Sequence, residues 1–180
     1  MSFKIDPYEI ELVEGCQVHD RTAQRALYDR YKDSMYTLLF RMLSNEEEAA
    51  DGLQEAFIEV FRSLASYQQK SSLGAWIKVI VVRTALRLQK RKMYFENIED
   101  HTHEADADPI VWDENLTSHY LQEGIKKLPQ GYRNVFLLVE VEGYAHKEVA
   151  ELLGISAGTS KSQLYHSKKM LQKLLKEIMY

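Results

Sequence analysis

Residues 146–156 read HKEVAELLGIS, and this stretch carries the most specific structural signal in the sequence. Its apolar residues recur at helical spacing, so it predicts a short helix. Gly154 can adopt the left-handed backbone conformation of a tight turn, and Ala150, four residues earlier, offers a small contact. Ser156 then has the position of an N-cap for a second helix, which we expect to run to about Glu177. Short helix, glycine turn and capped helix together are typical of a helix-turn-helix.

The second helix of this motif has two different faces. One face is apolar, with Leu164, Leu171, Leu174, Leu175 and Ile178. The other face is polar, with Thr159, Ser162, Tyr165, His166, Lys169 and Lys173. Hydroxyls, an imidazole and lysines suit phosphate and base-edge contacts in the major groove of DNA. Lysines are also common on a solvated amphipathic helix, but the turn and the polar face occur together, so we favour DNA reading.

The composition of the 180-residue chain favours a helical protein with a buried core. Apolar residues make up 45% and aromatic residues 11%, with three prolines and eight glycines. Cys16 is the single cysteine, which excludes an intramolecular disulfide and a cysteine-rich zinc site. Residues 1–10 lack the apolar stretch of a secretion signal, and no run approaches the roughly 18 apolar residues of a membrane span. We therefore expect a cytoplasmic protein without membrane insertion.

The first half of the chain reads as several helices, from about His19 to Lys92. One helix is expected after Ser44-Asn45, because three glutamates follow and suit the positive end of a helix dipole. Its apolar stripe is Leu53, Phe57, Val60, Phe61 and Leu64. A polar break at residues 68–72 precedes a long helix from about Leu73.

Charge is segregated along the chain, although the net charge of −4 taken alone argues against a nucleic-acid binder. Residues 83–92 contain five basic residues and no acidic one, whereas residues 93–117 contain eight acidic residues and no lysine or arginine. Helical periodicity fades in the acidic stretch and resumes near Leu116. The prediction is an all-α protein with a helical domain at residues 1–92, an acidic flexible linker at 93–115 and a second helical domain at 116–180.

Two other surfaces suggest binding, and for both the residues alone leave an alternative open. In the long helix Trp76 lines a stripe with Ile80, Arg83, Arg87 and Arg91, beside Lys90 and a loop that begins at Tyr67. An aromatic beside arginines suits single-stranded DNA, although Trp76 alone would more often be core. The earlier helix turns an acidic face away from its core stripe, with Glu47, Glu48, Asp51, Gln54, Glu55 and Glu59. That face suits a basic protein partner, but a solvated helix looks the same.

No catalytic arrangement stands out in the sequence. His101 and His103 lie in the acidic linker, but their spacing matches no standard metal motif. The chain has no P-loop and no dinucleotide fingerprint. We therefore expect neither a catalytic site nor a cofactor.

Several stretches resemble the sigma-70 family of bacterial RNA polymerase sigma factors. Residues 51–61, DGLQEAFIEVF, are similar to the D-x-x-Q-E-x-F helix of sigma region two, and residues 76–86 are similar to the segment that follows it. Residues 128–136, 142–150 and 153–162 resemble sigma region four. The acidic linker stands where larger housekeeping sigma factors have a further region. This arrangement is that of the extracytoplasmic-function type.

The resemblance implies a sigma factor that binds core RNA polymerase and promoter DNA, and whose family commonly has an anti-sigma factor as a partner. Region two would hold the polymerase through Asp51, Gln54 and Glu55. It would capture and melt the −10 element with Tyr67, Lys70, Ser71, Trp76, Arg83, Arg87, Lys90 and Arg91. Region four would read the −35 element with Ser156, Ala157, Thr159, Lys161, Ser162, Tyr165, His166, Lys169 and Lys173.

The chain departs from the family pattern at two positions. Arg83 stands where the family often has asparagine, which favours a phosphate contact there over base capture. Ser160 occupies a buried helix-turn-helix position usually filled by valine or isoleucine. A serine there could bond back to the carbonyl four residues earlier, and it weakens packing.

Two rival functions and a role for the linker also follow from the sequence. A stand-alone helix-turn-helix regulator would explain the C-terminal half but leave residues 51–61 and 76–91 without a role. A helical metalloenzyme using the linker histidines is the other rival. The acidic linker could fold back on the basic surfaces at 83–92 and 156–173 and compete with DNA phosphates, or it could be a passive spacer.

Overall fold

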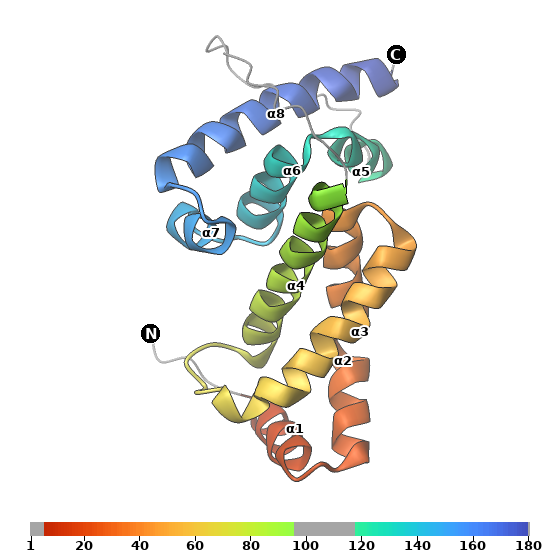
Figure 1. Ribbon diagram of the computed structural model, residues 1–180, viewed down its shortest axis with the longest axis vertical. Coiled ribbons are helices and arrows are strands. Elements are labelled where there is room, and N and C mark those ends of the chain that lie inside the picture. The colour runs from red at the N-terminus through yellow and green to blue at the C-terminus, as the bar shows by residue number, and fades with distance from the viewer. Residues whose placement is uncertain (1–5, 96–117, 180) are drawn as a thin grey trace. The chain divides into compact units, whose positions relative to one another are not determined.

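The computed structural model describes residues 6–95 and 118–179, and every regular element within them is a helix (Figure 1). This confirms the all-α prediction. The helices form two compact units, one within residues 1–95 and one within residues 96–180. Within the described residues, no helix has both the length and the apolar content needed to cross a bilayer. The acidic stretch 96–117, with His101, His103 and the proposed masking of DNA-binding surfaces, lies outside the described residues.

The first unit is a bundle built around α2. Its elements are α1 (Pro7–Gln17), α2 (Arg21–Leu43), α3 (Glu46–Ser63), the 3-10 turn η1 (Leu64–Ser66) and α4 (Leu73–Phe95). Helix α2 packs against α1, α3 and α4, and α3 packs against α4. The fully buried side chains at the centre include Leu27, Leu39, Val60 and Ile77. Burying them against one another supplies most of the unit's stability, at about 1.5–3 kcal/mol for each large apolar side chain.

The boundaries of α3 follow from local chemistry that the sequence displays. Ser44 ends α2 in the left-handed conformation, with φ of 56°. The Asn45 side chain then accepts a hydrogen bond from the Glu48 backbone N–H at 2.9 Å and caps α3. The predicted start of this helix is confirmed. In its apolar stripe Leu53, Phe57, Val60 and Leu64 are buried, whereas Phe61 is partly exposed.

Two features of the first unit differ from the sequence prediction. Helix α4 continues through residues 93–95, which the charge pattern had assigned to the linker. Helix α1 was not predicted at all, although its signals are present. The Asp6 side chain accepts a hydrogen bond from the Tyr8 N–H at 3.1 Å, and Pro7 occupies the first helical position. Leu12, Val13 and Cys16 form its buried side.

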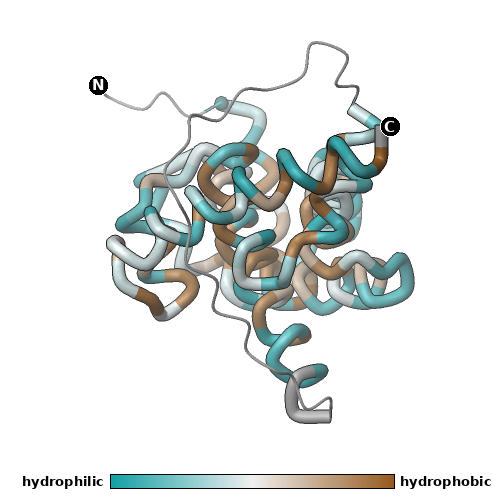
Figure 2. The backbone as a smooth tube through the Cα atoms, turned by 90° about the horizontal axis from the view of Figure 1, so that it is seen from above, coloured by the Kyte–Doolittle hydropathy of each residue, from teal (hydrophilic) through white to brown (hydrophobic). Residues whose placement is uncertain are grey.

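The second unit is built around α8. Its elements are α5 (Ser118–Lys127), α6 (Gln130–Phe136), a π-helical turn η2 (Leu137–Val141), α7 (His146–Leu153) and α8 (Ala157–Met179). Helix α8 packs against α5, α6 and α7. Leu137, Leu138 and Leu171 have no exposed surface. Figure 2 shows hydrophilic and hydrophobic stretches following one another along the helical turns, as expected of amphipathic helices.

Candidate nucleic-acid interface

The helix-turn-helix has the geometry that its sequence predicts. Gly154 ends α7 with φ of 69°, and the Ile155 N–H donates to the Ala150 carbonyl at 3.1 Å to close the turn. Ser156 caps α8, because its Oγ accepts a hydrogen bond from the Thr159 N–H at 2.9 Å. These short-range bonds fix the path of the backbone from α7 into α8.

Helix α8 buries its leucine face and exposes much of its polar face. Leu164, Leu171 and Leu175 are buried. The exposed members of the predicted −35 set are Ser156, Ala157, Thr159, Lys161, Ser162 and Lys173. Tyr165, His166 and Lys169 are half-buried, and the Lys169 ammonium lies 5.3 Å from the centre of the Tyr165 ring. The structure thus brings all nine predicted residues onto one helix and its cap.

A residue of α6 that was not predicted joins this face. The Tyr132 ring lies 6.2 Å from the His166 ring, with the two planes 27° apart. Tyr132 is therefore placed to hold the imidazole of His166 in a fixed orientation. The two residues are 34 positions apart in the chain, so helical periodicity could not connect them.

Ser160 is fully buried between α7 and α8, but its hydroxyl does not bond back along α8. Its Oγ lies 2.9 Å from Nδ1 of His146, the first residue of α7. The expectation of a bond to the carbonyl four residues earlier was wrong, because a side chain of the neighbouring helix supplies the partner. A buried hydroxyl is costly unless it is hydrogen-bonded, so the histidine offsets the use of serine at an apolar position.

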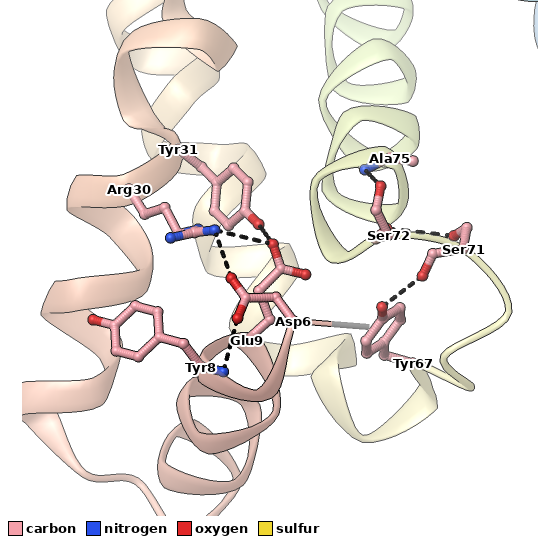
Figure 3. Close-up of polar contacts among 9 residues, drawn as sticks. All are labelled: Asp6, Tyr8, Glu9, Arg30, Tyr31, Tyr67, Ser71, Ser72 and Ala75. Carbon is pink, nitrogen blue, oxygen red and sulfur yellow. Dashed lines mark hydrogen bonds and ion pairs between the residues drawn. The ribbon is translucent and has the colours of Figure 1, made fainter. Parts of the chain in front are cut away.

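The loop between η1 and α4, residues 67–72, is tied to itself and to α4. The Tyr67 hydroxyl donates to the Ser71 carbonyl at 2.6 Å (Figure 3), and its ring centre lies 5.4 Å from that of Trp76. Tyr67 is buried, and this burial raises the pKa of its hydroxyl. Lys70 is exposed, while Ser71 and Trp76 are partly exposed. The structure confirms a loop beside Trp76.

The basic stripe of α4 divides into two kinds of residue. Among the described residues, Arg83 and Lys90 are exposed and have no ion-pair partner. Arg87 and Arg91 share one carboxylate, that of Glu55 on α3, at 2.8 Å and 3.7 Å. Exposed ion pairs of this kind contribute little to stability, at about 0–1 kcal/mol each.

The acidic face of α3 is solvent-exposed at Asp51 and Gln54, while Glu55 is half-buried beside the arginines of α4. Glu48 makes a second bridge to α4, with its Oε1 3.0 Å from Lys92 Nζ. The predicted polymerase-binding and −10 sets, which come from separate sequence motifs, therefore meet at Glu55.

Comparison with known families assigns both units. Residues 27–93 match the model of sigma-70 region 2, and residues 118–171 match that of sigma-70, region 4. The match of residues 27–93 accounts for the part of the chain that a stand-alone regulator would leave without a role. The first match contains the 67–72 loop and most of α4, and the second contains α7, the glycine turn and α8 as far as Leu171.

Whole-chain relatives give the same assignment. The ECF RNA polymerase sigma factor SigW of Bacillus subtilis is 30% identical over 176 residues, spanning 88% of this chain and 92% of SigW. The ECF RNA polymerase sigma-E factor of Haemophilus influenzae is 29% identical, spanning 93% of this chain and 95% of that protein. The solved sigma factor RpoE of Bartonella quintana, in complex with the anti-sigma factor NepR, has the same fold with a TM-score of 0.59 at 19% identity. That alignment covers 84% of this chain and 96% of that one. This chain therefore belongs to the extracytoplasmic-function (ECF) sigma factors of the sigma-70 family.

Proposed function

We propose that the protein binds core RNA polymerase in the cytoplasm, carries it to promoters through two DNA-reading surfaces, and performs no catalysis of its own. The observation that carries this proposal is the exposed polar face of α8, the helix that follows the turn at Gly154 and is capped by Ser156. It occurs in a chain whose other unit matches sigma-70 region 2. The test is run-off transcription with core polymerase on genomic fragments. Specific transcripts that require the protein are expected, and their absence would contradict the proposal.

The −10 element is proposed to bind the 67–72 loop and the exposed side of α4. Lys70, Arg83 and Lys90 offer positive charge for phosphates, and the partly exposed Trp76 ring offers a stacking surface. Arg87 and Arg91 contribute to the same field, although Glu55 partly neutralises them. Tyr67 is buried, so we assign it the task of shaping the loop.

The −35 element is proposed to bind the polar face of α8 from its cap at Ser156 to Lys173. The N-terminal end of α8 carries exposed hydroxyls at Ser156, Thr159 and Ser162 next to Lys161. Hydroxyl groups can contact either base edges or phosphates, whereas lysines mainly neutralise phosphates. Lys169 and Lys173 lie further along the same helix and extend the positive surface along the groove.

Substitutions on this face should separate phosphate contacts from base contacts. Lys173→Ala and Lys169→Ala should weaken binding to all duplexes alike and reduce the salt slope by about 1 for each lost phosphate contact. Ser162→Ala and His166→Ala should instead change sequence preference. Binding to a randomised duplex library, read by sequencing at two salt concentrations, measures both effects.

The matched control for this experiment is Lys126→Ala on α5. Lys126 already pairs with Glu123 at 2.8 Å and lies outside the predicted −35 set. Its loss should leave both affinity and sequence preference unchanged. An equal, uniform loss in all four α8 variants would place base recognition elsewhere.

Core polymerase is proposed to dock on the exposed acidic face of α3, where Asp51 and Gln54 are accessible. An anti-sigma factor is the second protein partner that we propose. A relative of the same fold was solved in complex with one, and the matched relatives are ECF sigma factors. Co-purification of the tagged protein with polymerase subunits, followed by exchange against an anti-sigma candidate, tests both partners.

A further inference from the structure

We propose that helix α1 positions the 67–72 loop, with Glu9 as the residue that fixes α1 in place and Tyr31 as the link to the loop. This inference rests on the proposed role of the loop in −10 recognition. It assigns a function to the one helix of the first unit that lies before the residues matching sigma-70 region 2.

Glu9 is the centre of the contacts that hold α1 (Figure 3). It is only 8% exposed, and its Oε1 accepts a hydrogen bond from the Tyr31 hydroxyl at 2.6 Å. Arg30 lies 3.5 Å from the same oxygen and 3.2 Å from Oδ2 of Asp6, the N-cap of α1. A buried carboxylate is costly unless it is paired and hydrogen-bonded. The Glu9 carboxylate is thus satisfied when α1 is docked on α2 in this register.

Tyr31 contacts both Glu9 and the start of α4. Burial, together with the bond to Glu9, raises the pKa of Tyr31 to about 12, so its hydroxyl stays protonated and donates at neutral pH. A methyl group at Gly74, the second residue of α4, would lie 3.0 Å from Tyr31 Cε1. The ring therefore rests directly against the first turn of α4, immediately after the loop.

Helix α1 also reaches the other end of the loop, because it packs against η1, which ends one residue before Tyr67. Burial, and after it the charge of Glu9, raises the pKa of the Tyr67 hydroxyl. Thus α1 contacts the element before the loop and, through Tyr31, the element after it.

The loop needs such support. Gln69 has φ of 56°, a left-handed conformation that is strained for a residue other than glycine. Three side-chain hydrogen bonds lie within residues 67–75: from the Tyr67 hydroxyl to the Ser71 carbonyl, from the Ser71 hydroxyl to the Ser72 carbonyl at 3.4 Å, and from the Ala75 N–H to the Ser72 hydroxyl at 3.1 Å. Because all three are local, the place of the loop in the unit depends on where η1 and α4 hold its ends. A loop that is already shaped loses less entropy when a DNA strand binds.

The test measures the affinity of holoenzyme for a single-stranded oligonucleotide that spans the −10 element of the genomic fragment transcribed best. We expect Tyr31→Phe and Glu9→Ala each to weaken this affinity about fivefold or more, and core-polymerase binding to stay unchanged. Glu9→Gln, which keeps an acceptor for the Tyr31 hydroxyl, should retain most of the affinity. The double variant Glu9→Ala, Tyr31→Phe should bind no more weakly than the worse single variant, because both changes remove the same bond.

A second readout follows the loop directly. In a Trp112→Phe background Trp76 is the single tryptophan, and its quenching by acrylamide should increase in Tyr31→Phe if the loop loosens. The control Leu43→Ala removes a buried side chain at the far end of α2. It should lower the melting temperature at least as much, yet leave both the oligonucleotide affinity and the Trp76 quenching unchanged.

Three outcomes would overturn the inference, and one of them also removes the proposed −10 assignment on which it rests. Wild-type affinity in Tyr31→Phe and Glu9→Ala, together with a loss in Lys70→Ala, would leave the −10 role intact and refute positioning by α1. An equal loss of oligonucleotide affinity in Leu43→Ala would show that the effect comes from lower stability of the unit and not from the position of the loop. Wild-type affinity in Lys70→Ala, Arg83→Ala and Trp76→Ala alike would refute the −10 assignment of the loop and α4, and the inference with it.

Discussion

Core RNA polymerase should bind the double variant Asp51→Lys, Glu55→Lys about 3 kcal/mol more weakly than the wild-type protein. A reversed charge that faces a complementary patch both loses attraction and adds repulsion, which costs several kcal/mol in total. Both residues lie on α3, and Asp51 is exposed. Titration of labelled protein with core polymerase measures the effect, and circular dichroism checks that helicity is unchanged.

Asp51 and Glu55 have different surroundings, so the two substitutions should also be made separately. Asp51→Lys alters only the exposed face, so its effect reports docking alone. Glu55→Lys also places an ammonium beside Arg87 and Arg91, which now share the Glu55 carboxylate. Asp33→Lys on α2 is the matched control for an exposed charge reversal outside the predicted docking set. Unchanged affinity in Asp51→Lys would contradict the assignment of this face.

Leu171→Ala should destabilise the second unit by about 2–5 kcal/mol and abolish −35 binding near the melting temperature of that unit. Leu171 has no exposed surface and packs where α8 meets α5. Removing it leaves a cavity at the contact that supports the DNA-reading helix. Thermal unfolding, followed alongside duplex binding, should show the transition of the second unit moving to lower temperature.

The substitution Gly124→Ala on α5 should partly restore the stability lost in Leu171→Ala. A methyl group at this position would lie 2.7 Å from Leu171 Cδ1, so Gly124→Ala alone should destabilise the unit. In the Leu171→Ala background the same methyl fills part of the cavity and adds helix propensity, which should restore about 1 kcal/mol. Leu39→Ala is the matched control, since Leu39 is equally buried in the first unit. It should leave −35 binding intact; if it weakens that binding as strongly, the two units are not energetically separate.

The helical class and the helix-turn-helix could be predicted from the amino-acid sequence, because both depend on signals within a few residues. Glycine at 154 supplies the left-handed turn, Ser156 caps the helix that follows, and Asn45 caps α3. Each of these contacts joins residues at most five positions apart, so local spacing suffices to predict it. The same kind of signal at Asp6-Pro7 would have revealed α1, and it was overlooked.

The partners of the functional side chains were decided only by the tertiary structure. The bond between Ser160 and His146 joins two helices, the ion pairs of Glu55 join residues 32 or more positions apart, and the bond from Tyr31 to Glu9 spans 22. Periodicity states which face of a helix a residue occupies, but not which residue of another helix meets it. Which residues come into contact depends on how the helices pack against one another. Packing is governed by the burial of whole apolar faces, and the spacing of residues within one helix does not reveal its geometry.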